Sequence, residues 1–328
     1  MVSLLDMPDV PMNLILGYGG PSVIFSLRKV CNNLRDYIDR TMPELHLKAI
    51  DICLGYKRIT ITWSHYLENV EISYMLHGNG YKTIVGENEK FVENVDYMEG
   101  FWNDYNLLMK FQNHSLQSFE LEMNNSMDVD DVSKFLKQYQ NSWLIKTQYL
   151  SLGIFQGDKF PMILQHLDAN CLNSIRFFRR RKYDKNIDFT EIVKLDQWKN
   201  AKEFRSDNLE ISAPMKHFTH FSKINTEFEY ILTEPESLNV LKEAAIRSPK
   251  FEKFIIEYHT FIESRQRLSE VFGKPFFHDD RQNKWLWFFN TCREEKILKI
   301  DNTEMSDRIY FSLIDSSMVP NGAEVKNL

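Results

Sequence analysis

Residues 4–39 read LLDMPDVPMNLILGYGGPSVIFSLRKVCNNLRDYID. The apolar residues of this stretch recur at steps of three and four, the spacing that places side chains on one face of an α-helix. Pro8 stands where a first helix would begin, and Pro11 falls in its first turn, where a missing N–H costs little. The sequence GYGGP at 17–21 separates this helix from the next. We therefore predict two or three short amphipathic helices.

Such helices would bury only about a dozen apolar side chains, which is too small a core for independent stability. A segment of this kind needs a partner or the rest of the chain. The pattern fits a docking module, and it fits equally a helical cap on a larger fold.

The same residues resemble an F-box, and in particular the F-box of nematode proteins that carry a carboxy-terminal FTH domain. The resemblance implies docking onto a Skp-type adaptor and, through it, a cullin. The residues that it implies for the adaptor contact are Leu5, Pro8, Ile15, Val30, Cys31 and Leu34. Two positions depart from the family pattern, Pro11 in place of an apolar residue and Gly19 in place of an aliphatic one. These departures predict a shorter first helix and a weaker contact.

The body of the chain is predicted to alternate strands and helices. Residues rich in Ile, Thr, Tyr and Val indicate strands at 47–54, 58–63 and 70–75. Further short strands are predicted at 118–121, 149–152, 174–177, 203–204, 228–231 and 254–256. Helical spacing predicts helices at 129–139, 162–167 and 237–246. A strand and helix that recur about every 25 to 30 residues fall in the range of leucine-rich-type repeats.

Neither the strand nor the helix of such a unit can close a core alone, so stacking of units is expected. The predicted fold class is therefore α+β with an α/β repeat: a small all-α module, then a leucine-rich-repeat-like curved sheet with outer helices. The regular Asn or Cys of standard leucine-rich repeats is missing. Strands predicted at 284–289, 296–301 and 308–315 would form a closing antiparallel meander that caps the sheet edge.

Two stretches of the body, QWKNAK at 197–202 and HFTHF at 217–221, resemble the FTH domain. The resemblance implies target recognition without identifying the target. It predicts four regions: an F-box at 1–46, a strand-rich linking region at 47–127, an FTH domain with strand-helix repeats at 128–275, and closing strands with a tail at 276–328.

Composition narrows the classes of partner and compartment. The net charge of −6 argues against broad binding to phosphate backbones. The basic run RRRK at 179–182, preceded by Arg176, is expected to be a solvated loop or strand end, with a nuclear-import or anion-binding patch as the alternative. The first twenty residues lack the basic start of a secretory signal, and no apolar run is long enough to span a membrane. Four widely spaced cysteines indicate a reducing compartment, so we expect the cytoplasm, with the nucleus as the alternative.

Residues with catalytic or metal-binding chemistry form no convincing motif. His217 and His220, with His278, Asp279 and Asp280, offer zinc-type ligands. They lack the helical i,i+4 spacing and the accompanying Glu of a zinc protease, so we expect them to hold a turn. We predict no catalytic residue, no metal and no cofactor.

These observations predict a non-catalytic adaptor that brings a target protein to a ubiquitin ligase of the Skp–cullin–F-box type. The alternative is an F-box-derived interaction scaffold without productive ligase docking. Aromatic residues in strands are candidate target contacts, with core packing as the competing role. These candidates are Trp63, Tyr149, Phe177, Phe228 and Tyr258.

Overall fold

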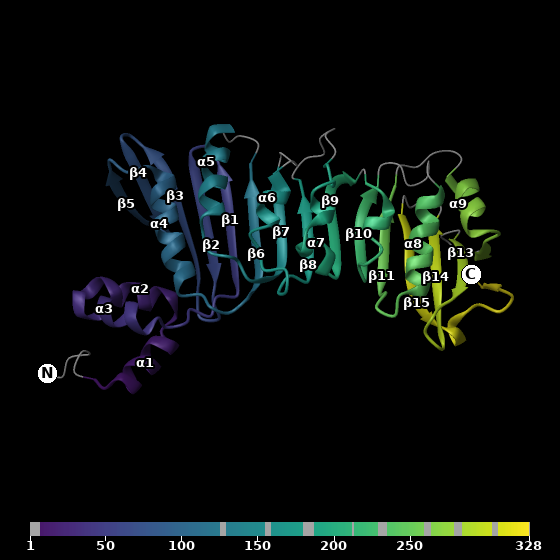
Figure 1. Ribbon diagram of the computed structural model, residues 1–328, viewed down its shortest axis with the longest axis horizontal. Helices are drawn as coiled ribbons and strands as arrows, with labels where there is room; N and C mark the ends of the chain where they lie inside the picture. The colour runs from purple at the N-terminus through teal and green to yellow at the C-terminus, as the bar shows by residue number, and fades with distance from the viewer. Residues whose placement is uncertain are drawn as a thin grey trace. The chain divides into compact units, whose positions relative to one another are not determined.

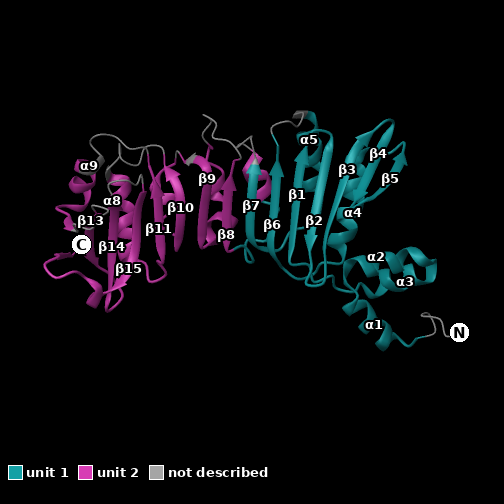
Figure 2. Ribbon diagram, turned by 180° about the vertical axis from the view of Figure 1, so that it is seen from behind, with its two compact units in different colours: residues 1–155, 165–172 teal, residues 156–164, 173–328 magenta. Residues whose placement is uncertain are grey.

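The structure is a computed structural model, and it describes residues 7–124, 129–154, 159–179, 187–211, 213–228, 235–258, 264–278, 284–303 and 308–327. The chain divides into two compact units (Figure 2). Unit 1 comprises residues 1–155 and 165–172, and unit 2 comprises residues 156–164 and 173–328.

Unit 1 begins with three short helices, α1 (Asp9–Tyr18), α2 (Gly20–Val30) and α3 (Asn32–Thr41), as Figure 1 shows. Pro8 is the N-cap of α1, and Pro11 lies in its first turn, as predicted. Gly19 separates α1 from α2, and Gly20, the first residue of α2, has a φ of 70°, a left-handed conformation that favours glycine. The predicted helical module is confirmed, and α1 extends over 10 residues despite Pro11.

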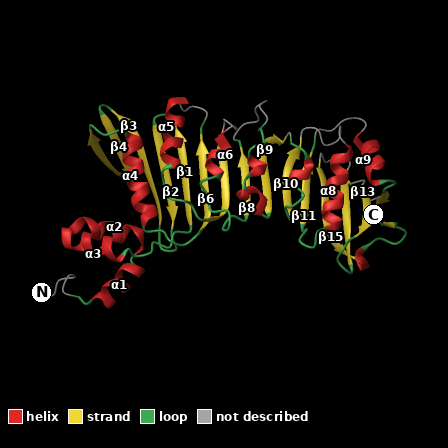
Figure 3. Cartoon of the chain, viewed as in Figure 1, coloured by secondary structure: helices red, strands yellow, loops and turns green. Residues whose placement is uncertain are grey.

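The sheet of unit 1 has strand order β5-β4-β3-β2-β1-β6-β7. The strands from β1 to β5 form an antiparallel meander, whereas β1, β6 and β7 are parallel. Helices α4 (Tyr97–Lys110) and α5 (Val129–Gln140) cover one face (Figure 3). The strands are β1 (Ala49–Gly55), β2 (Arg58–Ser64), β3 (Asn69–His77), β4 (Gly80–Val85), β5 (Asn88–Glu93), β6 (Leu116–Met123) and β7 (Thr147–Ile154).

The core of unit 1 follows from strand alternation and an aromatic cluster. In β1, Ile50, Ile52 and Leu54 are buried, while the residues between them lie on the more open face. On the helical side, the ring of Trp102 from α4 lies 4.9 Å, centroid to centroid, from that of Phe135 in α5. Aromatic pairs at this distance add to the stabilisation from burial itself.

Unit 2 has strand order β8-β9-β10-β11-β15-β14-β13-β12, with β16 beside β13. Strands β8, β9, β10 and β11 pair in parallel. The remaining neighbours in this order, from β11 through β15, β14 and β13 to β12, pair antiparallel. The strands are β8 (Ser174–Phe178), β9 (Glu203–Ile211), β10 (Lys223–Phe228), β11 (Lys253–Glu257), β12 (Phe276–His278), β13 (Lys284–Asn290), β14 (Lys296–Thr303), β15 (Arg308–Asp315) and β16 (Val325–Lys326). The α-helices are α6 (Phe160–Leu164), α7 (Asp196–Asn200), α8 (Pro235–Arg247) and α9 (Ser264–Phe272).

The predicted order of a helical module, strands with intervening helices and a closing meander is observed. Of the strand predicted at 228–231, only Phe228 lies within the described residues, where it ends β10, whose inward residues are Ile224, Thr226 and Phe228. The helix predicted at 162–167 is earlier and shorter, at α6. Among the described residues, no helix combines the length and the apolar character needed to cross a bilayer.

Candidate functional site: a docking surface on the amino-terminal helices

The three amino-terminal helices have a buried side. Met12 and Leu16 of α1 are 2% and 1% exposed, one helical turn apart. Ile24 of α2 and Ile38 of α3 are fully buried, and Leu34 is 4% exposed. This inward side accompanies the packing of α2 on both α1 and α3.

Helix α1 is also apolar on its outer side. Val10, Leu14 and Tyr18 follow one another at four-residue steps, so they form a stripe that is turned away from Met12 and Leu16. Their side chains are 71%, 55% and 73% exposed. A helix that is apolar on two faces is expected to have a second partner, because neighbouring exposed apolar side chains mark interaction sites.

Helix α2 adds two more exposed valines. Val23 and Val30 lie seven residues apart, on one face of the helix, and are 42% and 67% exposed. We call the exposed apolar residues of these helices the docking set: Val10, Leu14, Ile15, Tyr18, Val23 and Val30.

The residues implied by the F-box resemblance only partly coincide with this set. Pro8, Ile15 and Val30 are exposed, and Cys31 is half-buried. Leu34 lies inside because it shares the inner face of α3 with Ile38, so in this structure it supports the helices and does not meet a partner. Leu5 lies outside the described residues.

The sequence analysis did not predict four members of the docking set as contact residues: Val10, Leu14, Tyr18 and Val23. The signal was present in α1, where Val10, Leu14 and Tyr18 give a second helical stripe opposite the one that is buried.

Polar contacts hold the three helices in place. Arg28 of α2 donates two hydrogen bonds of 2.8 Å to the carboxylate of Asp39 in α3. The hydrogen bond from Arg28 holds the pKa of Asp39 below its ordinary value. Tyr37 of α3 donates to Oδ1 of Asn13 in α1 at 2.9 Å. The docking set is therefore presented by helices whose mutual geometry is fixed.

Helix α2 contacts the body of unit 1 through a hydrogen bond and an aromatic pair. The backbone N–H of Ser22 donates to Glu68 Oε1 at 2.8 Å, and the ring of Phe25 meets that of Phe111 edge-on at 6.2 Å. A cavity of about 230 Å³ lies beside these contacts, lined by residues of α2, β2, β3, β4 and α4.

Most of the aromatic residues that were predicted to contact a target are buried. Phe177 and Phe228 are 0% and 1% exposed, and Tyr258 is 5% exposed and accepts a hydrogen bond from Asn302 at 2.8 Å. Trp63 is 7% exposed and lines the cavity beside α2. A buried side chain cannot reach a partner in this structure, so these four residues serve as packing here.

Other aromatic side chains are accessible. Tyr149 of β7 is half-buried, beside Ser118 of β6 in the register of the sheet. Trp143 and Leu144, in the turn between α5 and β7, are 51% and 53% exposed and were missed from the sequence. Exposed Trp is a typical anchor of protein interfaces.

Comparison with known proteins identifies the two parts of the chain. The family model of the F-box domain matches residues 4–44, which include α1, α2 and α3. The model of the FTH domain matches residues 129–276, from the start of α5 to the first residue of β12. The chain thus contains an F-box domain followed by an FTH domain. It is 26% identical, over 298 residues, to F-box A protein 224 of Caenorhabditis elegans, an alignment that covers 88% of this chain and 74% of that protein. The expected resemblance is thus confirmed, and no solved structure matches the chain.

The signature residues of the FTH domain are structural. Phe218 is fully buried and meets the ring of Trp198 edge-on at 5.5 Å. Trp198 Nε1 donates to the backbone oxygen of His217 at 3.1 Å, and His220 Nε2 lies 2.9 Å from the backbone oxygen of Trp198. These reciprocal contacts join the QWKNAK stretch to the HFTHF stretch. We therefore assign both stretches a structural role in the FTH domain.

His217 and His220 therefore have backbone or packing roles in the FTH domain. The metal set imagined from the sequence also needs Asp279 and Asp280, which lie outside the described residues.

Proposed function

We propose that this chain is a substrate-recognition adaptor of a Skp–cullin–F-box ubiquitin ligase. The F-box docks a Skp-type adaptor through the docking set, and the rest of the chain holds a target protein. The observation that carries this proposal is the outer stripe of Val10, Leu14 and Tyr18 on a helix whose inner face is already buried. Burial of such side chains contributes roughly 1.5–3 kcal/mol each when complete.

The ligase role needs no active site in this chain. Holding a target near a charged conjugating enzyme raises their effective concentration, which accelerates transfer without a catalytic group in the adaptor. The F-box and FTH families support this non-catalytic role.

The body supports the role of receptor. Parallel strands followed by helices, as in β6, α5 and β7 of unit 1, support the leucine-rich-repeat-like arrangement that we expected from the sequence. Such repeats leave one sheet face and one set of loops open to a partner. We place the first target contacts at Trp143, Leu144 and Tyr149, because these side chains are accessible, whereas the other four aromatics predicted as target contacts are buried.

A second candidate function is an interaction scaffold that binds the adaptor without joining a ligase. The cavity of about 230 Å³ lined by α2 and the body of unit 1 favours it, because ligase geometry requires a firmly held F-box.

Co-purification separates these functions. The full chain is co-expressed with a Skp-type adaptor and a cullin, and each is sought after affinity purification and gel filtration. The proposal predicts one complex that contains all three proteins. A complex with the adaptor that excludes the cullin supports the scaffold, and a well-folded chain that binds neither rules out both functions.

A further inference from the structure

The segment that joins the F-box to β1 is held against the end of α4. Leu45 and Leu47 are 1% and 3% exposed. The N–H of Leu45 donates to the backbone oxygen of Phe111 at 3.1 Å, and the N–H of Leu47 donates to Gln112 Oε1 at 2.9 Å. Two side chains of this linker that are not used in the core, Glu44 and His46, are thereby placed beside residues 111–114.

The carboxylate of Glu44 is oriented by backbone donors. The N–H of Asn113 lies 2.9 Å from its Oε1 and 3.0 Å from its Oε2, and the N–H of His114 lies 3.3 Å from Oε1. The side chain of Glu44 is only 14% exposed, whereas that of His114 is 71% exposed. Glu44 is thus a fixed carboxylate at the edge of solvent.

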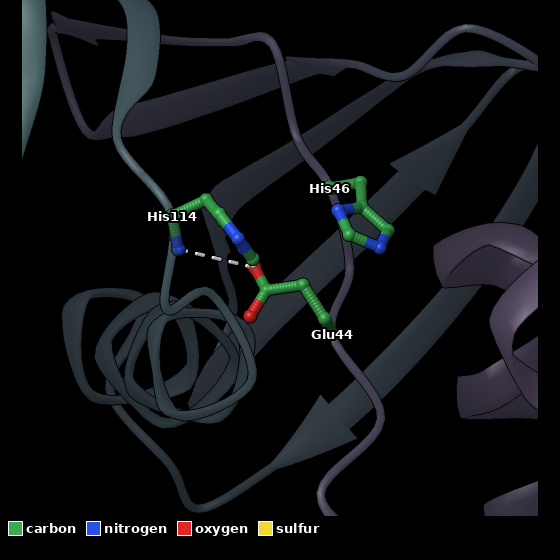
Figure 4. Close-up of side chains that lie close together, drawn as sticks. All are labelled: Glu44, His46 and His114. Atoms are coloured by element: carbon green, nitrogen blue, oxygen red, sulfur yellow. Dashed lines mark hydrogen bonds and ion pairs between the residues drawn. The ribbon is translucent and has the colours of Figure 1, made fainter. Parts of the chain in front are cut away.

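Two imidazoles converge on this carboxylate. His114 Nδ1 lies 3.4 Å from Glu44 Oε1, and the rings of His46 and His114 are 5.4 Å apart, centroid to centroid (Figure 4). One ligand atom from each of the three residues lies within 4.8 Å of the others. Neighbouring ligands in a tetrahedral zinc site, with bonds of 2.0–2.1 Å, are about 3.3 Å apart. The distance from His114 Nδ1 to Glu44 Oε1 already matches this separation. Rotation of the exposed His46 side chain can bring its ring nitrogen to the same distance from the other two ligand atoms.

We propose that Glu44, His46 and His114 bind one Zn²⁺ ion, with water in the fourth position. Two imidazoles and a carboxylate suit zinc and disfavour Ca²⁺ and Mg²⁺, which prefer oxygen ligands alone. The backbone bonds to Glu44 act as the outer shell that orients a ligating carboxylate. The three residues are separate from the histidines singled out in the sequence.

A bound ion would join the linker that follows the F-box to the end of α4. Both segments belong to unit 1, and the contacts between them are the backbone and Gln112 hydrogen bonds together with Glu44. The zinc site would therefore act as a clamp that limits movement of the F-box relative to the sheet that follows it. This proposal does not depend on adaptor binding.

The test uses the full chain after removal of metal with a chelator. Zn²⁺ is titrated by calorimetry, and Co²⁺ is used as a second probe, because tetrahedral Co²⁺ absorbs visible light far more strongly than the hydrated ion. His46→Gln and His114→Gln remove single ligands at exposed positions, where folding should be unaffected. His77→Gln, at an exposed histidine of β3, is the matched control.

We expect one equivalent of Zn²⁺ per chain, an affinity at least about tenfold weaker in each ligand variant, and wild-type affinity in His77→Gln. Amide hydrogen exchange over 42–48 should slow on addition of Zn²⁺ in the wild type and not in His114→Gln. Absence of stoichiometric Zn²⁺ binding would overturn the site. Equal Zn²⁺ affinity in all three variants would also overturn it, because scattered surface histidines would give that result. Zinc binding with unchanged exchange over 42–48 would overturn the clamp.

Discussion

Arg28 and Asp39 join α2 to α3 through a two-point ion pair, in which Nε–Oδ1 and Nη2–Oδ2 are both 2.8 Å. This geometry is the most favourable one for an ion pair near a surface, because the planar guanidinium matches the carboxylate. The pair lies among the helices that present the docking set. Its loss should therefore loosen the docking surface before it affects the body.

We predict that Asp39→Asn weakens the packing of α2 on α3 by about 1 kcal/mol. The expected loss is small because the side chains of Arg28 and Asp39 are both partly exposed to water. Because the pKa of Asp39 is lowered in the folded chain, its stabilisation is present above the ordinary pKa and is lost as the pH falls through the lowered value. Hydrogen exchange of α2 and α3 at neutral pH measures the effect. Asp36→Asn, at an exposed position of the same helix, should leave exchange unchanged, and equal effects of the two variants would contradict the role of the pair.

Asp51 of β1 faces Glu120 of β6 across the parallel register. Partial removal from water and the neighbouring Glu120 carboxylate both raise the pKa of Asp51. An acid whose pKa is raised by folding costs stability once the pH exceeds its ordinary pKa. Asp51→Asn should therefore stabilise the chain at pH 7, by roughly 0.2–1 kcal/mol as estimated for like charges on facing strands, and have little effect near pH 3.

Urea unfolding at the two pH values measures this difference. Glu71→Gln is the matched control, because Glu71 faces Thr62 and has no acidic neighbour in that register. Stabilisation by both variants would point to general charge reduction instead of the Asp51–Glu120 pair.

Phe218 and Thr219 are adjacent residues of the FTH signature with different surroundings. Phe218 is fully buried, and its ring lies 5.1 Å from that of Phe228, whereas Thr219 donates a hydrogen bond of 3.0 Å to the backbone oxygen of Lys216 near the surface. Phe218→Ala should cost about 3–5 kcal/mol through the cavity it leaves. Thr219→Ala should cost about 1 kcal/mol or less. Thermal unfolding measures the loss of stability in each variant. Similar losses in the two variants would contradict a core-packing role for this signature.

His166 should make stability depend on pH. Burial beside Tyr139, whose ring is 5.0 Å away, lowers the pKa of His166. The unfolded chain then binds the proton more readily, so stability falls as the pH drops below the ordinary pKa of His166 toward the lowered one. His166→Gln should reduce this slope in urea titrations at several pH values. An unchanged slope would assign the effect to other histidines with lowered pKa values, such as His65.

The target contact can be tested apart from folding. Trp143→Ala removes an exposed side chain, so it should leave the unfolding transition within about 0.5 kcal/mol of the wild type. Once a target is found by crosslinking in cells, this variant should bind it more weakly, by 1 kcal/mol or more if Trp143 is an anchor. Phe91→Ala, an exposed aromatic of β5, is the control, and equal binding by both variants would remove Trp143 from the target surface.

The sequence predicted those elements whose periodicity reflects burial on one side. The alternation of Ile50, Ile52 and Leu54 marked β1, and helix α8 was visible from its apolar spacing. Strand β5 was missed because its residues are mostly exposed and half of them are charged, as suits an edge strand. Helix α4 was missed because aromatic residues occupy adjacent positions, Phe101 and Trp102, and obscure a single stripe.

The sites were harder to predict than the elements. Leu34 matched the family spacing, but only the fold shows that it points inward with Ile38. Glu44 and His114 are 70 positions apart, and they meet because hydrogen bonds align the linker with the end of α4, which no local pattern records.

Affinity for a Skp-type adaptor tests the central claim most directly. The dissociation constant is measured by calorimetry for the wild type, for Ile15→Ala/Val30→Ala in the docking set, and for Leu76→Ala, an exposed apolar residue of β3. We predict saturable binding by the wild type and by Leu76→Ala, and a loss on the order of 2 kcal/mol or more, about thirtyfold, in the double variant. A folded wild type that does not bind, or a double variant that binds as tightly as the wild type, would contradict the proposal that the docking set is the adaptor site.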